Sequence, residues 1–450
     1  MDSIEDKISS YAASLDYTDL TPEALRAVKR SFIDSIGCAV GALEAEPVRI
    51  ARQVAVHMSS DRPATLFGTS IKTSPEMAAF VNGTMIRYLD FNDDYINNDG
   101  PHPSDNIAAI LAVCESLHAG GKSLACGITL AYEIVDQLVD LARFKTGGWD
   151  YVTETAIGSA LGVGKALNLS KQQMAQALRL AVAPNISLLQ SRSGELSMWK
   201  ACAGPNAARN GVFAAMLAHA GMAGPNQVFE GTFGLCNQVT GRFEIGALGG
   251  SGHPFKIEET FFKPRPVMYT ALLSVETALA LRKEIDIDNI ESIRIILDGF
   301  SVASSRHPES WDPHTRETAD HSKQYVVVAA LLYGEISDET FTPERIRDPR
   351  ILALLRKVSL EEDPDFTREF PKTFNCRIEV MGQSGQKWVR HLRNPKGHPA
   401  NPMSDAEIEE KFMVLTQKAF TSKQARSTLE LLWHLEDIDD VSRITRAIEV

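Results

Sequence analysis

The sequence predicts a mainly α protein, in which a large all-helical domain (residues 1–261 and 404–450) holds an inserted smaller α+β domain (residues 262–403). Three observations indicate this fold class. Apolar residues recur at helical spacing through most of residues 1–250. A segment rich in Gly and Pro follows near residue 245, and strand-like alternation lies beyond it. Helical patterning returns from Ser404, so the tail is expected to rejoin the first domain.

The helical part carries helix-start signals and runs of small residues. Thr73-Ser-Pro-Glu76 and Ser170-Lys-Gln-Gln173 both match a capping box, in which two side chains bond each other's backbone N–H groups. Gly and Ala recur within residues 158–167 and 201–221. Because a Gly in a helix interior costs about 1 kcal/mol relative to Ala, these positions are expected to allow close helix packing.

The smaller domain mixes strand and helix patterns. Residues 291–297 (ESIRIIL) predict a strand. Residues 375–392 predict a β-hairpin that turns at Gly382-Gln-Ser-Gly385, with Ile378 and Val380 on one face. The segment DHSKQYVVVAALLYGEI, which lies between them, predicts a helix.

Composition places the chain among folded globular proteins and disfavours several classes of partner. The 450 residues are 44% hydrophobic and 23% charged, which suits a large core. The net charge of -12 disfavours nucleic acid and an anionic membrane surface. Six cysteines without a CxxC pair provide no zinc or iron–sulfur motif. No signal-peptide or membrane-spanning pattern is visible, so we expect a cytoplasmic protein without a membrane partner.

Arg192, Glu195 and Lys200 gather ionisable groups directly before a segment rich in small residues. Because burying an unpaired charge is costly, this pattern is typical of a site for an anionic ligand. A helix N-terminus with solvated surface charges explains it equally well. Lys263 and Arg265 bring further cations to the expected domain junction.

An acidic cluster, Asp90, Asp93 and Asp94, follows a helical segment. Carboxylates at a helix C-terminus face the negative end of the helix dipole, so other groups must stabilise them. Structural caps and the wall of a polar pocket both remain open as interpretations. A calcium loop is disfavoured, because the spaced acidic pattern that ends in Glu is missing.

His102 stands between two prolines, just before an apolar helical segment. A rigid loop of this kind can hold a His for acid–base work, and a surface His beside helix caps is the alternative. Arg316 and His321 lie among acidic residues with which they can pair locally. The chain lacks GxGxxG after a strand, GxxxxGK(S/T), HExxH and GxSxG, which excludes the corresponding nucleotide, zinc-protease and hydrolase sites.

Taken together, five segments resemble the MmgE/PrpD family, whose members include 2-methylcitrate dehydratase, cis-aconitate decarboxylase and an iminodisuccinate epimerase. They recur in order across most of the chain, and HPSDN, GELSMWK and ETADHS are more similar to the dehydratase branch. The five segments are LDFND (89–93), HPSDN (102–106), GELSMWK…NAARNGVFAA (194–215), FKPRP (262–266) and RETADHS (316–322).

The resemblance implies that the smaller domain is a lid and that the active site lies between the domains, in a homodimer. It also implies catalysis without a metal or organic cofactor. By position within the motifs, Asp90, His102, Lys200 and Lys263 match polar active-site residues of the family.

Two positions depart from the family pattern. Tyr151 stands where family members commonly have a His, and the stretch Val267-Met268-Tyr269-Thr270 lacks the His that usually follows the Lys-x-x-Pro element. We expect Tyr151 to donate a proton in place of imidazole and Met268 to line a more apolar pocket. Both changes disfavour turnover of 2-methylcitrate itself, and they disfavour decarboxylation more.

The sequence therefore predicts dehydration of a citrate-like tricarboxylic acid. Lys200, Lys263 and Arg192 are the candidates that stabilise the dianionic aci-carboxylate intermediate, which is the harder part of the reaction. His102 is the candidate base or acid, and Asp90 is expected to orient it.

The predicted substrate is 2-methylcitrate or, preferably, a longer alkylcitrate from a biosynthetic pathway to anhydride-type natural products. Asp93 and Met268 complete the expected substrate-binding set beside Arg192 and Lys263. Decarboxylation or epimerisation of a related polycarboxylate remains an alternative, as does a non-catalytic relative that binds polycarboxylates.

Overall fold

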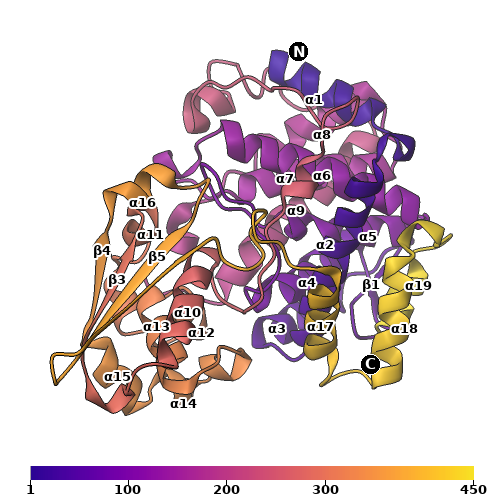
Figure 1. Cartoon of the computed structure of the whole chain (residues 1–450). Helices are drawn as coiled ribbons and strands as arrows, with labels where there is room; N and C mark the ends of the chain where they lie inside the picture. The colour runs from indigo at the N-terminus through magenta and orange to yellow at the C-terminus, as the bar shows by residue number, and fades with distance from the viewer. Residues whose placement is uncertain (1) are drawn as a thin grey trace.

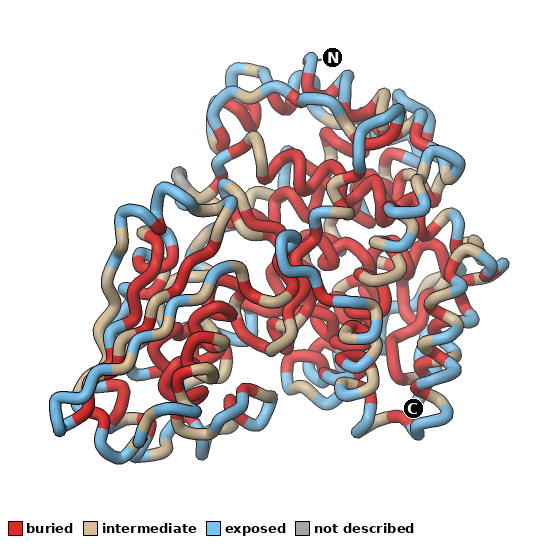
Figure 2. The backbone as a smooth tube through the Cα atoms, in the orientation of Figure 1, coloured by how far each residue is buried: buried red, intermediate tan, exposed pale blue. Residues whose placement is uncertain are grey.

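The structure is a computed structural model that describes residues 2–450. Figure 1 shows a large helical body beside a smaller body that carries a twisted sheet. Buried residues form a separate hydrophobic core in each body, and Figure 2 shows both cores inside an exposed outer layer. The predicted mainly α class is confirmed, because helices dominate the element order.

The helical body is built from N-terminal and C-terminal segments, which Figure 1 shows in indigo to magenta and in yellow. A two-residue pair, β1 (Ala64–Thr65) and β2 (Lys72–Thr73), precedes α4. The N-terminal helices are α1 (Ser3–Ser14), α2 (Pro22–Gly41), α3 (Glu46–Ala55), α4 (Pro75–Tyr88), α5 (Ile107–Ser116), α6 (Gly121–Leu141), α7 (Val152–Ala166), α8 (Lys171–Val182) and α9 (Trp199–His219). The C-terminal helices are α17 (Asp405–Thr416), α18 (Ser422–Trp433) and α19 (Ser442–Ala447).

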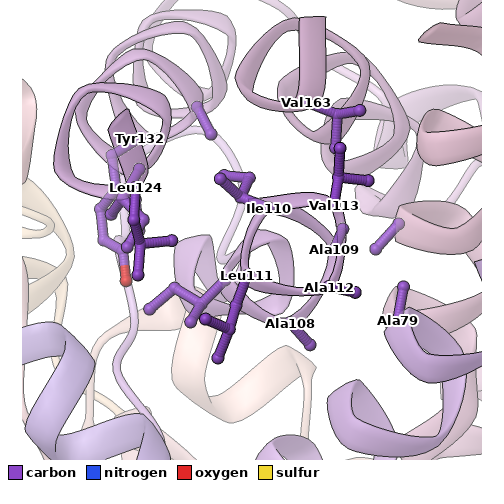
Figure 3. Close-up of a cluster of buried hydrophobic side chains, with 14 of the residues drawn as sticks. Ala79, Ala108, Ala109, Ile110, Leu111, Ala112, Val113, Leu124, Tyr132 and Val163 are labelled. Atoms are coloured by element: carbon purple, nitrogen blue, oxygen red, sulfur yellow. The ribbon is translucent and has the colours of Figure 1, made fainter. Parts of the chain in front are cut away.

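Helix α5 lies at the centre of the larger core. Every residue from Ile107 to Glu115 is buried, and Figure 3 shows Ala79 of α4, Tyr132 of α6 and Val163 of α7 around it. A helix that is apolar on all sides must be enclosed by other elements, because no face of it suits water.

Small residues allow close helix contacts, as predicted. A Cβ atom on Gly162 of α7 would lie 2.8 Å from the carbonyl oxygen of Gly127 on α6. The predicted capping box at Ser170 and Gln173 is confirmed by both reciprocal bonds. The capping box predicted at Thr73 is wrong. The Thr73 hydroxyl donates to backbone carbonyl groups earlier in the chain and so does not cap α4. The residue that precedes α4 is Ser74, and its side chain makes no capping bond.

The smaller body carries a four-stranded sheet in the order β4-β3-β5-β6. The predicted strand and hairpin are confirmed, and β5 pairs antiparallel with both β3 and β6. Strand β4 runs parallel to β3 and was not predicted. The strands are β3 (Ile290–Leu297), β4 (Val358–Glu362), β5 (Asn375–Gly382) and β6 (Lys387–Arg393).

The helices of the smaller body cover one face of the sheet. Ile295, Ile378 and Val380 are buried in the same core as α10 and α13, whereas Arg294 pairs with Glu361 and Glu379 on exposed positions. The predicted helix within 320–336 is confirmed as α13. These helices are α10 (Tyr269–Arg282), α11 (Gly299–Ala303), α12 (Arg316–Ala319), α13 (Lys323–Tyr333), α14 (Pro343–Ile346), α15 (Pro349–Leu355) and α16 (Pro364–Glu369).

The C-terminal segment packs on the helical body. Lys411 of α17 lies 2.6 Å from the carboxylate of Asp34 on α2, and a Cβ atom on Gly37 would touch the Phe412 ring at 3.3 Å. The division at residues 262 and 404 stays a prediction. No helix in the described part of the chain combines the length and apolarity needed to cross a membrane.

Candidate active site

A cavity of about 430 Å³ is lined by loops of the helical body together with α10, α11, α12 and the segment that precedes α13. Most of the residues predicted from the sequence line it, although they come from distant parts of the chain. The predicted residues in the lining are Asp90, His102, Tyr151, Arg192, Lys263 and Met268.

Asp90 is the anion around which the buried cations of this site gather. It follows the end of α4 in a left-handed backbone conformation, with φ of 51°. Its Oδ1 atom pairs with the guanidinium of Arg87 and lies 3.5 Å from the Nζ atoms of Lys200 and of Lys263. All four side chains are at most 2% exposed, so their charges must compensate one another.

These contacts set the charges in the cluster. Burial would raise the pKa of Asp90, but Lys200, Lys263 and Arg87 hold it well below its ordinary value. Burial lowers the pKa of Lys200 to about 8, although Asp320 and Asp90 oppose the shift. Lys200 has no exposed side-chain surface and does not line the cavity.

His102 is held as a neutral imidazole. Its Nδ1 atom lies 2.6 Å from the carbonyl oxygen of Asp93, and its Nε2 atom lies 4.0 Å from Oδ1 of Asp90. Burial, with Arg87 and Lys263 adding to it, lowers the pKa of His102 well below its ordinary value. The ring therefore stays neutral and offers one free nitrogen.

Asp93 and Asp94 point to different surroundings although they are adjacent. The Asp93 carboxylate accepts hydrogen bonds from the Tyr132 hydroxyl at 2.6 Å and the Ser104 backbone at 3.1 Å, away from the cavity lining. Its contribution to the site is the carbonyl group that holds His102, rather than the predicted substrate contact. Asp94, which the sequence placed only in the acidic cluster, lines the cavity instead.

Arg192 and Tyr151 form a second wall of the cavity. Arg192 Nε donates to Asp150 at 3.1 Å, its Nη1 donates to the Lys200 carbonyl at 3.0 Å, and its guanidinium lies 4.9 Å from the Tyr151 ring centroid. The Tyr151 hydroxyl is buried without a hydrogen-bond partner among residues 2–450. Glu195, predicted to share this cluster, is exposed.

Three side chains form what we call the apolar wall: Met268, Phe300 and Ala303. Phe300 and Ala303 are at opposite ends of α11 and both are exposed; Met268 is half-buried before α10. Behind the wall, the Nζ atom of buried Lys323 lies 3.9 Å from the Met268 sulfur and 3.1 Å from Ser304 Oγ. The uncovered apolar surface suits a hydrocarbon group of a ligand.

Sequence reasoning missed a further contact with Asp90 at the cavity. His321 was expected to pair locally; its Nδ1 atom does lie 2.5 Å from Asp320, but its Nε2 atom also faces Asp90 Oδ2 at 3.9 Å. Arg87 was missed because a single Arg at the end of an apolar helix reads as a surface residue. The motif RETADHS was the available signal for Asp320 and His321.

Asp90, Asp320 and His321 place their ligand atoms within 4.8 Å of one another, as a metal site would require. Lys200 already lies between the two carboxylates, 3.5 Å from Asp90 and 3.6 Å from Asp320. A divalent cation there would meet this ammonium group, so the residues present fit Lys200 better than a metal ion. Catalysis without any cofactor stays a prediction.

Comparison with models of known protein families identifies the family of this chain. Residues 6–247 match the MmgE/PrpD N-terminal domain, and residues 266–437 match the MmgE/PrpD C-terminal domain. The chain belongs to the MmgE/PrpD family. The resemblance seen in its five segments is thereby confirmed, and each of those segments contributes at least one residue to the cavity described above.

MmgE/PrpD relatives of known name include both dehydratases and a decarboxylase. Human cis-aconitate decarboxylase is 26% identical over 99% of this chain and 95% of its own length. The mitochondrial 2-methylcitrate dehydratase of Yarrowia lipolytica is 30% identical over 79% of this chain and 72% of its own length. The 2-methylcitrate dehydratase of Salmonella typhimurium is 27% identical, over 89% and 87% respectively. These relatives support a lyase family for citrate-like acids.

Proposed function

We propose that the protein is a hydro-lyase that removes water from a 2-alkylcitrate whose substituent is longer than methyl. The observation that carries this proposal is the composition of a single cavity. Arg87, Arg192 and Lys263 supply cations for carboxylates, and the apolar wall supplies a surface for the alkyl group. A ligand that combines both features suits this lining better than citrate does.

His102 is the base in this proposal. Its neutral ring presents Nε2 as the free nitrogen, which can accept the proton on the carbon next to a substrate carboxylate. Removing that proton builds negative charge on the carboxylate. Lys263 and Arg192, fixed by buried partners, are placed to stabilise that charge without reorganising.

The second half of the reaction needs a group that protonates the departing hydroxyl. The sequence pointed to Tyr151, whose hydroxyl has no partner among the described residues and whose ring lies 6.1 Å from that of His102. Lys200 has a different part: it holds Asp90 and Asp320 in place and thereby the cations and imidazoles that face the ligand.

The proposal also gives the smaller body the part of a lid. Lys263, Met268 and His321 come from the segment 262–403, whereas His102 and Arg192 come from the helical body. Closure of such a site would expel water and strengthen its electrostatic interactions. A homodimer belongs to the same proposal and is tested by light scattering.

Decarboxylation is the second candidate, because human cis-aconitate decarboxylase aligns over 99% of the chain. These reactions, and epimerisation as a third, differ in product mass. Dehydration removes one water, decarboxylation removes one carbon dioxide, and epimerisation leaves the mass unchanged.

Mass-resolved incubation tests the proposal directly. Purified, EDTA-treated protein is incubated separately with 2-methylcitrate, hexylcitrate and octylcitrate. Loss of one water from the longer compounds, with little from 2-methylcitrate, is the expected result. Turnover of 2-methylcitrate alone would show that the substrate carries a short substituent. Loss of carbon dioxide, or turnover only when a metal is added back, would overturn the assigned chemistry.

A further inference from the structure

Asp94 is a carboxyl group in the cavity that has no part in the function proposed above. It is 4% exposed and belongs to the cavity lining. Its backbone is fixed by two hydrogen bonds of 2.9 Å with the backbone of Phe261, one in each direction. The carboxyl group is therefore held at a defined place beside the cations.

The surroundings of Asp94 determine which oxygen carries a proton. Its Oδ2 atom lies 3.6 Å from Nζ of Lys263 and 3.6 Å from Nδ1 of His102. Its Oδ1 atom has no hydrogen-bond partner among residues 2–450. Since Oδ1 is buried, Oδ2 is the oxygen that the cavity can reach, and a proton that passes to a ligand leaves from Oδ2. The charged and titratable groups that face Asp94 are Lys263, Asp90, Arg87, Asp93, His102 and Tyr269.

The net effect of these neighbours is a carboxyl group that is protonated at neutral pH. Burial raises the pKa of Asp94 to about 8, with Lys263 opposing the shift and Asp90 adding to it. A general acid works best when its pKa lies near the working pH. Tyr151 is a weaker candidate, because burial raises the pKa of its phenol above an already high value.

We propose that Asp94 is the general acid that protonates the departing hydroxyl group. This inference rests on the dehydratase function proposed above. It leaves Tyr151 as a hydrogen-bond donor to a substrate carboxylate, beside Arg192.

The proton balance of the step closes within the site. The carbon–hydrogen bond next to a carboxylate breaks and its proton moves to Nε2 of His102. The electron pair forms the new double bond as the neighbouring carbon–oxygen bond breaks. The departing oxygen takes the proton from Oδ2 of Asp94 and leaves as water. Asp94 is then a carboxylate beside Lys263, and the extra proton on His102 returns to it through water before the next turnover.

Replacing Asp94 separates the two halves of the reaction. Asp94→Asn keeps the shape and the neutral charge of the protonated group but cannot release a proton. We expect it to lower kcat for an alkylcitrate by about 10²–10⁴-fold. Incubated in D₂O, the same variant should still exchange the substrate's α-proton for deuterium, because His102 is intact. Asp140→Asn, a matched change outside the cavity lining, should keep wild-type turnover.

A substrate with a better leaving group provides the second measurement. An alkylcitrate analogue that carries fluoride in place of the hydroxyl group needs less help from an acid. Asp94→Asn should therefore eliminate fluoride at a rate close to that of the wild type. Tyr151→Phe should lower water loss less than Asp94→Asn does.

The outcomes distinguish this inference from the proposed function. If wild-type protein removes no water from any alkylcitrate, the dehydratase proposal itself fails. If wild type is active and Asp94→Asn is equally active, only the assignment of Asp94 fails. Loss of both deuterium exchange and fluoride elimination in a folded Asp94→Asn protein would also overturn it, because Asp94 would then act before the carbon–oxygen bond breaks.

Discussion

The Nδ1 atom of His102 lies 2.6 Å from the carbonyl oxygen of Asp93. A carbonyl oxygen only accepts, so Nδ1 carries the proton of the neutral ring and Nε2 keeps its lone pair. Burial beside Arg87 and Lys263 keeps the pKa of His102 well below its ordinary value, so the ring does not protonate at neutral pH. One backbone contact thus fixes which nitrogen keeps the lone pair.

His102→Gln tests this assignment. Glutamine can still donate to the Asp93 carbonyl group, but it has no basic nitrogen. We expect kcat for an alkylcitrate to fall by about 10²–10⁴-fold, with thermal unfolding unchanged. Deuterium exchange at the α-carbon should be lost as well, in contrast to Asp94→Asn. Exchange at the wild-type rate in His102→Gln would assign the base to another residue.

The activity should fall above about pH 8. Lys200 and Asp94 both have a pKa of about 8, and both are needed in the protonated form. As pH rises through this value, Lys200 loses the charge that balances Asp90, and Asp94 loses the proton that it donates. A profile of kcat from pH 6 to pH 10 checks this. The residual activity of Asp94→Asn should retain one ionisation, that of Lys200, and a flat profile to pH 10 contradicts the assignment of both.

The elements that the sequence predicted well are those whose signal is local. Strand β3 and the hairpin of β5 and β6 show two-residue alternation, and α13 is a continuous apolar run. Strand β4 escaped prediction because it is only five residues long and has just two apolar residues, Val358 and Leu360, which are too few to signal a strand. The capping signal at Thr73 failed because that hydroxyl is taken by Ala55 and Met58, which are distant in sequence.

The residues of the candidate site likewise fall into those with a local sequence signal and those without one. His102 and Lys263 were found because a rigid loop and a Pro-bounded cation are visible in short motifs. The choice between Asp93 and Asp94 was not predictable, since adjacent side chains on an irregular loop differ only in what the fold places around them. Asp93 meets Tyr132 from α6, whereas Asp94 meets Lys263. Such partners come from tertiary packing and leave no mark on the local sequence.

Asp90→Asn should destabilise the fold strongly. The substitution leaves Arg87, Lys200 and Lys263 buried without the anion that they share. Removing one partner of a buried ion pair typically costs about 3–5 kcal/mol, because the remaining charge is uncompensated. Urea unfolding at neutral pH measures the free energy of unfolding. Asp365→Asn, which breaks an exposed pair with Arg368, is the control and should cost about 1 kcal/mol or less.

Met268→Gln should shift substrate preference toward shorter substituents. The change keeps the length of the side chain but replaces apolar contact surface in the apolar wall with an amide. Losing contact with one or two methylene groups costs about 0.8–1.6 kcal/mol, so kcat/KM for octylcitrate should fall about tenfold relative to 2-methylcitrate. Met216→Gln, at an exposed position of α9, is the matched control. An unchanged ratio of the two kcat/KM values would place the alkyl group elsewhere.

Lys323→Met should stabilise the protein, and more so at low pH than at high pH. Lys323 is fully buried, and no carboxylate lies within 4 Å of its Nζ atom in the described chain. Burial lowers its pKa from 10.5 to about 7. Between these values the unfolded chain binds the proton and the folded chain does not, so wild-type stability rises with pH over that window.

Methionine carries no charge in either state, so this contribution disappears in Lys323→Met. The stability advantage of the variant should therefore shrink by about 2 kcal/mol between pH 7 and pH 9. Urea unfolding of both proteins at the two pH values measures it. Lys418→Met, an exposed position, serves as the control and should show no such change. If the advantage of Lys323→Met is the same at both pH values, the ammonium group keeps its proton in the folded state, and its two serine partners then stabilise the charge.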